Sequence, residues 1–182
     1  MFSPQIRVLI IDDSAIARNT LSRILETDPE IQVVGTAPDA LIGLRKIAEC
    51  SPDVLTLDVE MPKMDGLTFL ERLMSSRPMP VVMVSAYTSE GSETALRALD
   101  LGALEIIEKP SIDVSSGLQE LALQITDKVK AAAQAKLKSP QQRFQKQHLR
   151  NSHTQLAHSK LKTISHDYIS DKNSKFLIFS NF

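Results

Sequence analysis

Apolar positions along the first two thirds of the chain follow two alternating patterns. Short, nearly continuous apolar runs occur at residues 6–11, 31–35, 54–57, 80–84 and 104–107. Runs of this length and composition are typical of strands that are covered on both faces of a sheet. The pattern therefore predicts five strands.

Each of these runs is followed by a segment with apolar residues at helical spacing. Ser14 can cap the first helix, in which Ile16, Ala17, Leu21, Ile24 and Leu25 form the apolar stripe. Further helices are expected at residues 39–50, 67–76 and 92–101, and a fifth begins near Ser115 or Ser116. Five strand–helix repeats predict an α/β fold with a parallel sheet and helices on both faces.

Two of these helices carry more specific expectations. On the second, we expect Leu41, Leu44, Ile47 and Ala48 to share the inner face. On the fifth, the inner stripe comprises Leu118, Leu121, Ala122, Ile125 and Val129. No Gly or Pro occurs in residues 118–139, so this last helix is expected to continue towards Pro140.

The charge of the chain changes sign along its length. Residues 1–126 carry ten Lys and Arg against 19 Asp and Glu, a net charge of −9, whereas residues 127–182 carry 11 against three, a net charge of +8. The last glycine is Gly117. We therefore predict a globular domain at residues 5–125, a helical and basic linker at 126–150, and a disordered or aberrant tail at 151–182.

Several classes of protein are disfavoured by composition. No stretch approaches the roughly 18 consecutive apolar residues of a membrane span. The single cysteine, Cys50, excludes an internal disulfide and fits a reducing cytoplasm. The four histidines lie in a polar stretch, at His148, His153, His158 and His166, and their spacings do not match two ligands on one helix turn, so zinc is not expected. The lysines near the end of the chain are dispersed and no helix-turn-helix pattern accompanies them, so nucleic acid binding is not expected.

Polar side chains follow four of the five predicted strands. Asp12 and Asp13 follow the first, Asp58 the third, Ser85 the fourth and Lys109 the fifth. The carboxyl ends of parallel strands lie at one edge of the sheet, where ligands bind. Clustered carboxylates repel one another unless a cation joins them, and their oxygens suit Mg²⁺. A lysine and a hydroxyl beside that metal complete a site where an aspartate can accept a phosphoryl group.

Each residue alone has a simpler interpretation. The Asp12-Asp13 pair can cap a helix, Asp58 can belong to a turn, and Lys109 can begin a loop. Their joint occurrence after four strands favours the functional interpretation. Phosphatases with an aspartate nucleophile begin with Asp-x-Asp, which this chain lacks, and no Gly-x-Gly-x-x-Gly motif for a dinucleotide follows the first strand.

Residues 8–14, 57–66 and 108–110 resemble the receiver domains of two-component response regulators. The resemblance implies a flavodoxin-like, doubly wound, five-stranded parallel sheet in the order 2-1-3-4-5 with five helices. It also implies that Asp58 is phosphorylated by a histidine kinase. Asp13 and Asp58 would then ligate Mg²⁺ together with the backbone carbonyl of Glu60, and Asp12 would assist through water.

The same resemblance assigns three further features. Ser85 corresponds to the switch hydroxyl and Lys109 to the lysine that pairs with the phosphate. The bond from Lys109 to Pro110 is expected to be cis. Many receivers carry an aromatic residue three positions before the lysine, where this chain has Ile106, so the surface readout of phosphorylation is expected to be weaker or different.

Residues 58–71, 77–85 and 91–103 further resemble the regulatory half of chemotaxis protein-glutamate methylesterases. This implies a chemotaxis-type histidine kinase as partner, with chemoreceptors or an esterase domain as further candidates. No Gly-flanked nucleophile turn of a Ser-His-Asp hydrolase follows Gly117, so no methylesterase activity is expected from these 182 residues. We interpret the chain as the regulatory part of such a protein, in the form of a truncated or frameshifted fragment.

Overall fold

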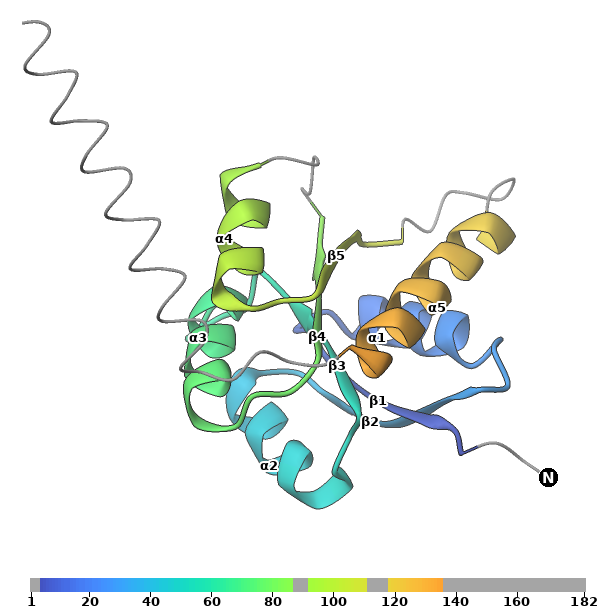
Figure 1. The fold of residues 1–182 in the computed structure, drawn as a ribbon, viewed down its shortest axis with the longest axis horizontal. Coiled ribbons are helices and arrows are strands. Elements are labelled where there is room, and N and C mark those ends of the chain that lie inside the picture. Colours follow the sequence, from blue (N-terminus) through green and yellow to red (C-terminus); the bar gives the residue numbers. More distant parts are fainter. Residues whose placement is uncertain (1–3, 87–91, 111–117, 136–182) are drawn as a thin grey trace, which may run out of the picture. The chain divides into compact units, whose positions relative to one another are not determined.

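A parallel five-stranded sheet forms the centre of the computed structural model, which describes residues 4–86, 92–110 and 118–135 (Figure 1). Its strands lie in the order β2-β1-β3-β4-β5, as expected. They are β1 (Ile6–Ile11), β2 (Ile31–Ala37), β3 (Val54–Asp58), β4 (Val81–Ser85) and β5 (Glu105–Glu108). The structure therefore confirms the flavodoxin-like fold class.

Five helices within the described residues cover the two faces of this sheet (Figure 1). They are α1 (Ala15–Leu25), α2 (Ala40–Cys50), α3 (Gly66–Ser76), α4 (Glu93–Leu101) and α5 (Leu118–Gln134). The first four begin where a short polar side chain accepts a hydrogen bond from a free backbone N–H. These capping residues are Ser14, Asp39, Asp65 and Ser92.

The core consists of two apolar clusters that the sheet separates. Successive side chains of a strand point to opposite faces. Leu9 and Ile11 of β1 accordingly pack in the cluster beneath α2, α3 and α4, whereas Val8 and Ile10 pack in the cluster beneath α1 and α5. Because both faces need apolar side chains, the strands read as continuous apolar runs.

The inner face of α2 differs from the one expected. Ala40, Gly43 and Ile47 are buried, whereas Leu41 and Leu44 are 63% and 45% exposed and Ala48 is exposed too. A Cβ atom on Gly43 would lie 2.7 Å from Cδ1 of Ile11, so the helix backbone runs close to β1. Small residues permit that approach, and the larger leucines are turned outward.

The first helix and the last one also depart from expectation in detail. Ile16 of α1 is 62% exposed, because it lies in the first turn at the sheet edge, while Leu21, Ile24 and Leu25 are buried as predicted. The expected start of α5 near residue 115 and its extension to 139 lie outside the described residues.

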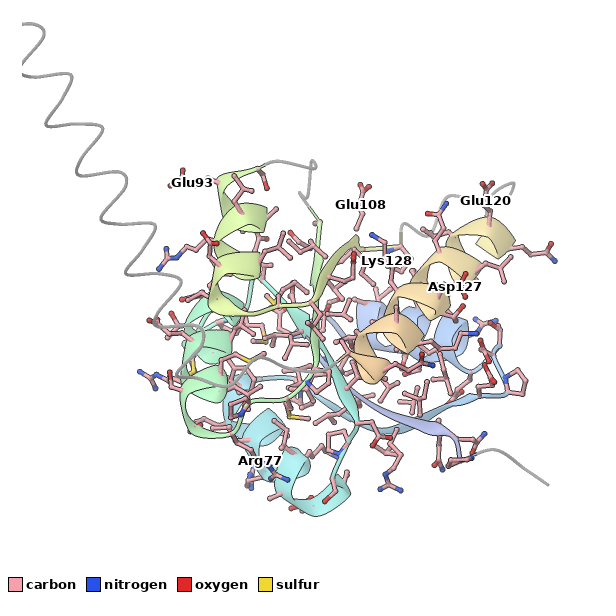
Figure 2. The ribbon with its side chains drawn as sticks, in the orientation of Figure 1. Arg77, Glu93, Glu108, Glu120, Asp127 and Lys128 are labelled. Carbon is pink, nitrogen blue, oxygen red and sulfur yellow. The ribbon has the colours of Figure 1, made fainter. Side chains whose placement is uncertain are left out.

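The described part of α5 packs as one body with the sheet. Val129 and Ala132 are buried, Lys130 Nζ lies 2.7 Å from Asp28 Oδ2, and Lys128 Nζ lies 3.1 Å from Glu105 Oε2. Figure 2 shows Lys128 between α5 and β5. The domain boundary expected at residue 125 therefore falls inside this helix, while the linker beyond residue 135 and the tail lie outside the described residues.

No helix among the described segments combines the length and the apolarity that crossing a bilayer requires.

One buried hydroxyl supplies a prediction about stability. Thr56 of β3 is 1% exposed, and its Oγ1 has no hydrogen-bond partner among the described residues. An unpaired buried hydroxyl costs roughly 1–3 kcal/mol. We expect Thr56→Val, which keeps the shape and removes the hydroxyl, to raise the free energy of unfolding by about 1 kcal/mol. Urea denaturation at neutral pH measures this as a higher midpoint with an unchanged slope.

Thr126 provides the matched control. It is 2% exposed, but its hydroxyl donates to the carbonyls of Ala122 and Leu123, each at 3.0 Å. Thr126→Val should therefore bring no gain. A Thr56→Val variant that is less stable than the parent protein would show that the hydroxyl of Thr56 is hydrogen-bonded.

Candidate functional site

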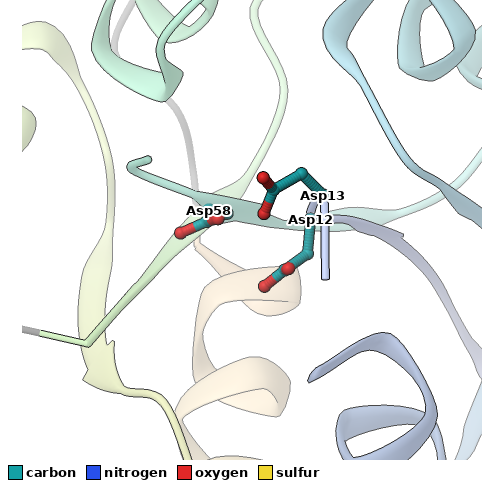
Figure 3. Close-up of side chains that lie close together, drawn as sticks. All are labelled: Asp12, Asp13 and Asp58. Carbon is teal, nitrogen blue, oxygen red and sulfur yellow. The ribbon is translucent and has the colours of Figure 1, made fainter. Parts of the chain in front are cut away.

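Three carboxylates meet at the carboxyl edge of the sheet. Asp12 and Asp13 follow the last residue of β1, and Asp58 ends the neighbouring strand β3. One oxygen from each lies within 4.8 Å of the others, and Figure 3 shows the three side chains gathered in one region. Asp12 and Asp58 are buried, whereas Asp13 is exposed. The cluster thus has two enclosed carboxylates and one that faces solvent.

Hydrogen bonds hold the loop that carries the first two carboxylates. The Asp12 N–H donates to the carbonyl of Ala37 at 3.1 Å, which continues the pairing of β1 with β2. Oδ1 of Asp12 accepts from the Ser14 N–H at 2.8 Å. From the first turns of α1, Nη1 of Arg18 donates to the carbonyls of Asp12 at 2.7 Å and Asp13 at 3.0 Å.

Lys109 joins the cluster from the end of β5. Its Nζ lies 2.9 Å from Asp58 Oδ2 and 3.0 Å from Asp12 Oδ2, so one ammonium bridges two buried carboxylates. The backbone N–H of Lys109 donates to the carbonyl of Ser85 at 2.8 Å. That hydrogen bond extends the β4–β5 ladder and fixes where the lysine leaves the sheet.

The protonation equilibria reflect this mixture of burial and charge. Burial raises the pKa of Asp58, and the nearby negative charge of Asp12 adds to this, which together outweigh the opposing effect of Lys109. Burial alone would lower the pKa of Lys109, but its bonds to Asp58 and Asp12 outweigh burial, so the pKa is raised. Lys109 therefore stays charged, whereas burial disfavours the ionised form of the neighbouring Asp58 carboxyl group.

The remaining predicted site residues lie at the same edge. Ser85 is buried at the end of β4, and the register pairs its neighbour Val84 with Asp58. The backbone N–H of Glu60 donates to Oδ1 of Asp58 at 3.2 Å, which places Glu60 directly beside the carboxylate. The structure thus brings Asp12, Asp13, Asp58 and Lys109 together and sets Ser85 and Glu60 next to them.

The donor set fits a hard divalent cation. Each of the three side chains in the cluster offers a carboxylate oxygen as a ligand atom. Asp13 is exposed, so one side of the cluster is open to water. Mg²⁺ prefers carboxylate oxygens and retains several waters. The cluster also contains three carboxylates against one lysine, an excess of negative charge that a cation would balance.

One expectation about the site is wrong, and one residue at the site was not expected. The described residues contain no cis peptide bond, so the prediction of a cis bond between Lys109 and Pro110 is wrong. The bond is trans, which is the form that X–Pro bonds favour by about 0.5–1 kcal/mol. Arg18 was not expected at the site at all. Its spacing, five residues after Asp13 and one helical turn after Ser14, is the only sequence signal that could have identified it.

Ile106, the residue that departs from the receiver pattern, is half-buried on β5. It packs against the core cluster beneath α2, α3 and α4. Its carbonyl accepts a hydrogen bond from Nζ of Lys128 at 3.2 Å, so this position is linked to α5 through its backbone.

Comparison with known families gives one match over most of the described residues. The model of the response regulator receiver domain matches residues 8–121. Among solved structures, the response regulator domain of Thermotoga maritima CheB is similar with a TM-score of 0.65 and 38% identity, over 72% of this chain and 98% of that one. A complex of the P1 domain of CheA3 with CheY6 from R. sphaeroides gives a TM-score of 0.59 and 34% identity, over 71% of this chain and 99% of the matched one.

Curated relatives with high identity are longer proteins. A protein-glutamate methylesterase/protein-glutamine glutaminase of Methylobacillus flagellatus is 56% identical over 132 residues, which is 72% of this chain and 37% of the relative. A protein of the same description from Xanthomonas campestris is 57% identical over the same shares. This chain therefore spans less than half the length of these relatives, and the receiver match lies in the first part of this chain.

Proposed function

This chain belongs to the family of response regulator receiver domains, and on that premise we propose that Asp58 accepts a phosphoryl group from a histidine kinase. One observation carries the proposal. Asp58 is a buried carboxylate at the end of β3 whose Oδ2 lies 2.9 Å from Nζ of Lys109, beside the carboxylates of Asp12 and Asp13. A nucleophile, a cation and an acidic cluster thus meet at one point.

The side chains divide the work of phosphoryl transfer. An oxygen of Asp58 attacks the phosphorus, the bond from phosphorus to the donor nitrogen of the kinase histidine breaks, and an acyl phosphate forms. Lys109 offers a compact positive charge to the incoming phosphoryl oxygens. Ser85 supplies a hydroxyl at the neighbouring strand end, where it can donate to the same group.

Asp13, Asp58 and the backbone carbonyl of Glu60 would hold Mg²⁺ directly, and Asp12 would assist through water. When bound, this ion would neutralise phosphoryl charge as a Lewis acid. The excess of carboxylates over lysine in the cluster supports this assignment.

Incubation with acetyl phosphate tests the proposal without a partner protein. We expect intact-mass spectrometry to detect one added phosphoryl group when MgCl₂ is present and none when EDTA removes the metal. Incorporation that is equally fast in EDTA would contradict the role of the acidic cluster.

A kinase domain must contact the surface around Asp58 to deliver its phosphoryl group. Asp13 lies in the same acidic cluster as Asp58, and Ile16 is the exposed large apolar residue closest in sequence to Asp13. Ile16 is 62% exposed in the first turn of α1. The similarity to CheY6, which was solved in complex with a CheA3 P1 domain, supports a kinase-type partner. We propose that Ile16 contacts that partner.

Ile16→Ala is therefore expected to slow phosphorylation by a cognate chemotaxis kinase about tenfold, since truncating an interface anchor costs roughly 1–2 kcal/mol. The rate with acetyl phosphate should be unchanged, because this donor needs no docking surface. Leu41→Ala is the matched control, because Leu41 is 63% exposed on α2, a helix that covers the other face of the sheet from α1. Equal losses with both donors would contradict a docking role.

We further propose that the receiver regulates a methylesterase domain within a longer protein. The support is that the relatives are described as protein-glutamate methylesterases and that this chain matches only part of their length. The hydrolase activity would then belong to the part of those relatives beyond the match. Chemoreceptors would be indirect partners. Cys50 is a free cysteine, and because thiols stay reduced in the cytoplasm, it supports a cytoplasmic location.

A further inference from the structure

Arg18 makes two hydrogen bonds at the edge of the acidic cluster. A single guanidinium nitrogen, Nη1, donates to the carbonyl oxygens of both Asp12 and Asp13, at 2.7 and 3.0 Å. Both bonds are charge-assisted, which makes them stronger than bonds between neutral groups. The side chain thus reaches back from α1 and connects the helix to the backbone of both acidic residues.

These two bonds add to the other hydrogen bonds that hold the loop. On one side, the Asp12 N–H is bonded to β2; on the other, Ser14 caps α1 and its N–H donates to Oδ1 of Asp12. Without the guanidinium of Arg18, the peptide units at Asp12 and Asp13 would lose the donor that their carbonyls share and could rotate more freely. The orientation of a peptide unit sets the direction of the side chains on either side of it.

We propose that Arg18 is a positioning residue for the cation site, holding the Asp12–Asp13 backbone so that both carboxylates face Asp58. The inference rests on the proposed function, because it concerns the Mg²⁺ that phosphoryl transfer would use. Partners that orient metal ligands typically contribute about 10- to 100-fold to metal affinity.

The charge of Arg18 works in the opposite direction, which makes the inference testable. The guanidinium carries a positive charge beside the backbone carbonyls of two of the acidic residues, and a positive charge there repels a divalent cation. Removing the charge alone should therefore tighten Mg²⁺ binding. Removing the orientation should weaken it. The sign of the change in affinity therefore separates positioning from simple electrostatics.

The experiment is calorimetric titration of the full 182-residue chain with MgCl₂. We expect Arg18→Met to weaken Mg²⁺ binding about tenfold. Arg18→Lys keeps the charge and most of the stem but not the planar fork, and it should also bind Mg²⁺ more weakly than the parent protein. Arg23→Met is the control, since Arg23 is an exposed arginine of the same helix, and it should leave the affinity unchanged.

Phosphorylation kinetics supply a second measurement, the Mg²⁺ concentration at half-maximal rate, which a purely structural role of Arg18 would not change. With acetyl phosphate, the variants should need more Mg²⁺ for half-maximal rate but reach a similar rate at saturating Mg²⁺. Circular dichroism identifies any variant that fails to fold. If Arg18→Met fails to fold, the Mg²⁺ affinity of Arg18→Lys relative to the parent protein tests the inference.

Equal or tighter Mg²⁺ binding in the folded Arg18 variants would overturn the inference while leaving the proposed function intact. Absence of both Mg²⁺ binding and phosphorylation in the parent protein would instead refute the proposed function and this inference with it.

Discussion

Asp58→Asn is expected to abolish phosphoryl acceptance completely, because an amide oxygen is not a nucleophile of comparable strength and cannot form an acyl phosphate. Incubation with acetyl phosphate and MgCl₂, followed by intact-mass spectrometry, measures the loss. Asp127→Asn is the control, since Asp127 is a 72% exposed carboxylate on α5 and the variant should be labelled like the parent protein. Undiminished incorporation in Asp58→Asn would place the phosphoacceptor elsewhere.

The same variant should change the pH dependence of stability in metal-free protein. The pKa of Asp58 is raised in the folded state, mainly by burial, so its ionisation favours unfolding. Below the ordinary pKa of 3.8 the carboxyl is protonated in both states, and the difference in stability between the parent protein and Asp58→Asn should not change with pH. As the pH rises through the folded-state pKa, the parent protein should lose stability that Asp58→Asn retains. Urea unfolding across this range measures the difference, and a difference that stays constant throughout would contradict the raised pKa.

Gly66→Ala is expected to lower the free energy of unfolding by about 3 kcal/mol, at the upper end of the usual cost of overpacking. A Cβ atom on Gly66 would overlap the carbonyl oxygen of Asp58 and would also crowd the Asp58 carbonyl carbon at 2.9 Å and Val59 Cα at 3.0 Å. These are backbone atoms, which cannot rotate away. The start of α3 must therefore move from the end of β3, and the bond from the Gly66 N–H to the Val59 carbonyl, 2.9 Å long, must stretch.

Gly43→Ala is the matched control for that prediction. Its added Cβ would meet Cδ1 of Ile11 at 2.7 Å, but this atom is the flexible end of a side chain. Replacing glycine inside a helix gains up to about 1 kcal/mol of helix propensity, which offsets the crowding. Urea denaturation should therefore find Gly43→Ala close to the parent protein. A similar value for Gly66→Ala would show that α3 can shift without cost.

The strand pattern and the acidic cluster were predictable from sequence because both depend on short-range rules. Continuous apolar runs identify strands buried on both faces, and parallel strands bring their carboxyl ends to one edge. Asp12, Asp13, Asp58 and Lys109 follow such ends, so their contact is a consequence of topology. No long-range detail of packing was needed for this inference.

The differences arise where packing distance or side-chain reach decides the outcome. The inner face of α2 is not predictable from apolarity, which favours Leu41 and Leu44. The helix approaches Ile11 closely at Gly43, and that approach requires a small residue there. Arg18 escapes prediction because a long side chain that returns to backbone carbonyls leaves no periodic pattern. The hydroxyl of Thr56 has no partner among the described residues, and this too depends on which side chains surround it in the fold.

The most direct test of this account identifies the residue that carries the phosphoryl group. After incubation with acetyl phosphate and MgCl₂, borohydride reduces an aspartyl phosphate to homoserine, which remains in the chain and can be located by peptide mass spectrometry. We predict homoserine at position 58, only in samples that contained MgCl₂. Homoserine at another aspartate, or a phosphorylated protein with unmodified Asp58, would contradict the account.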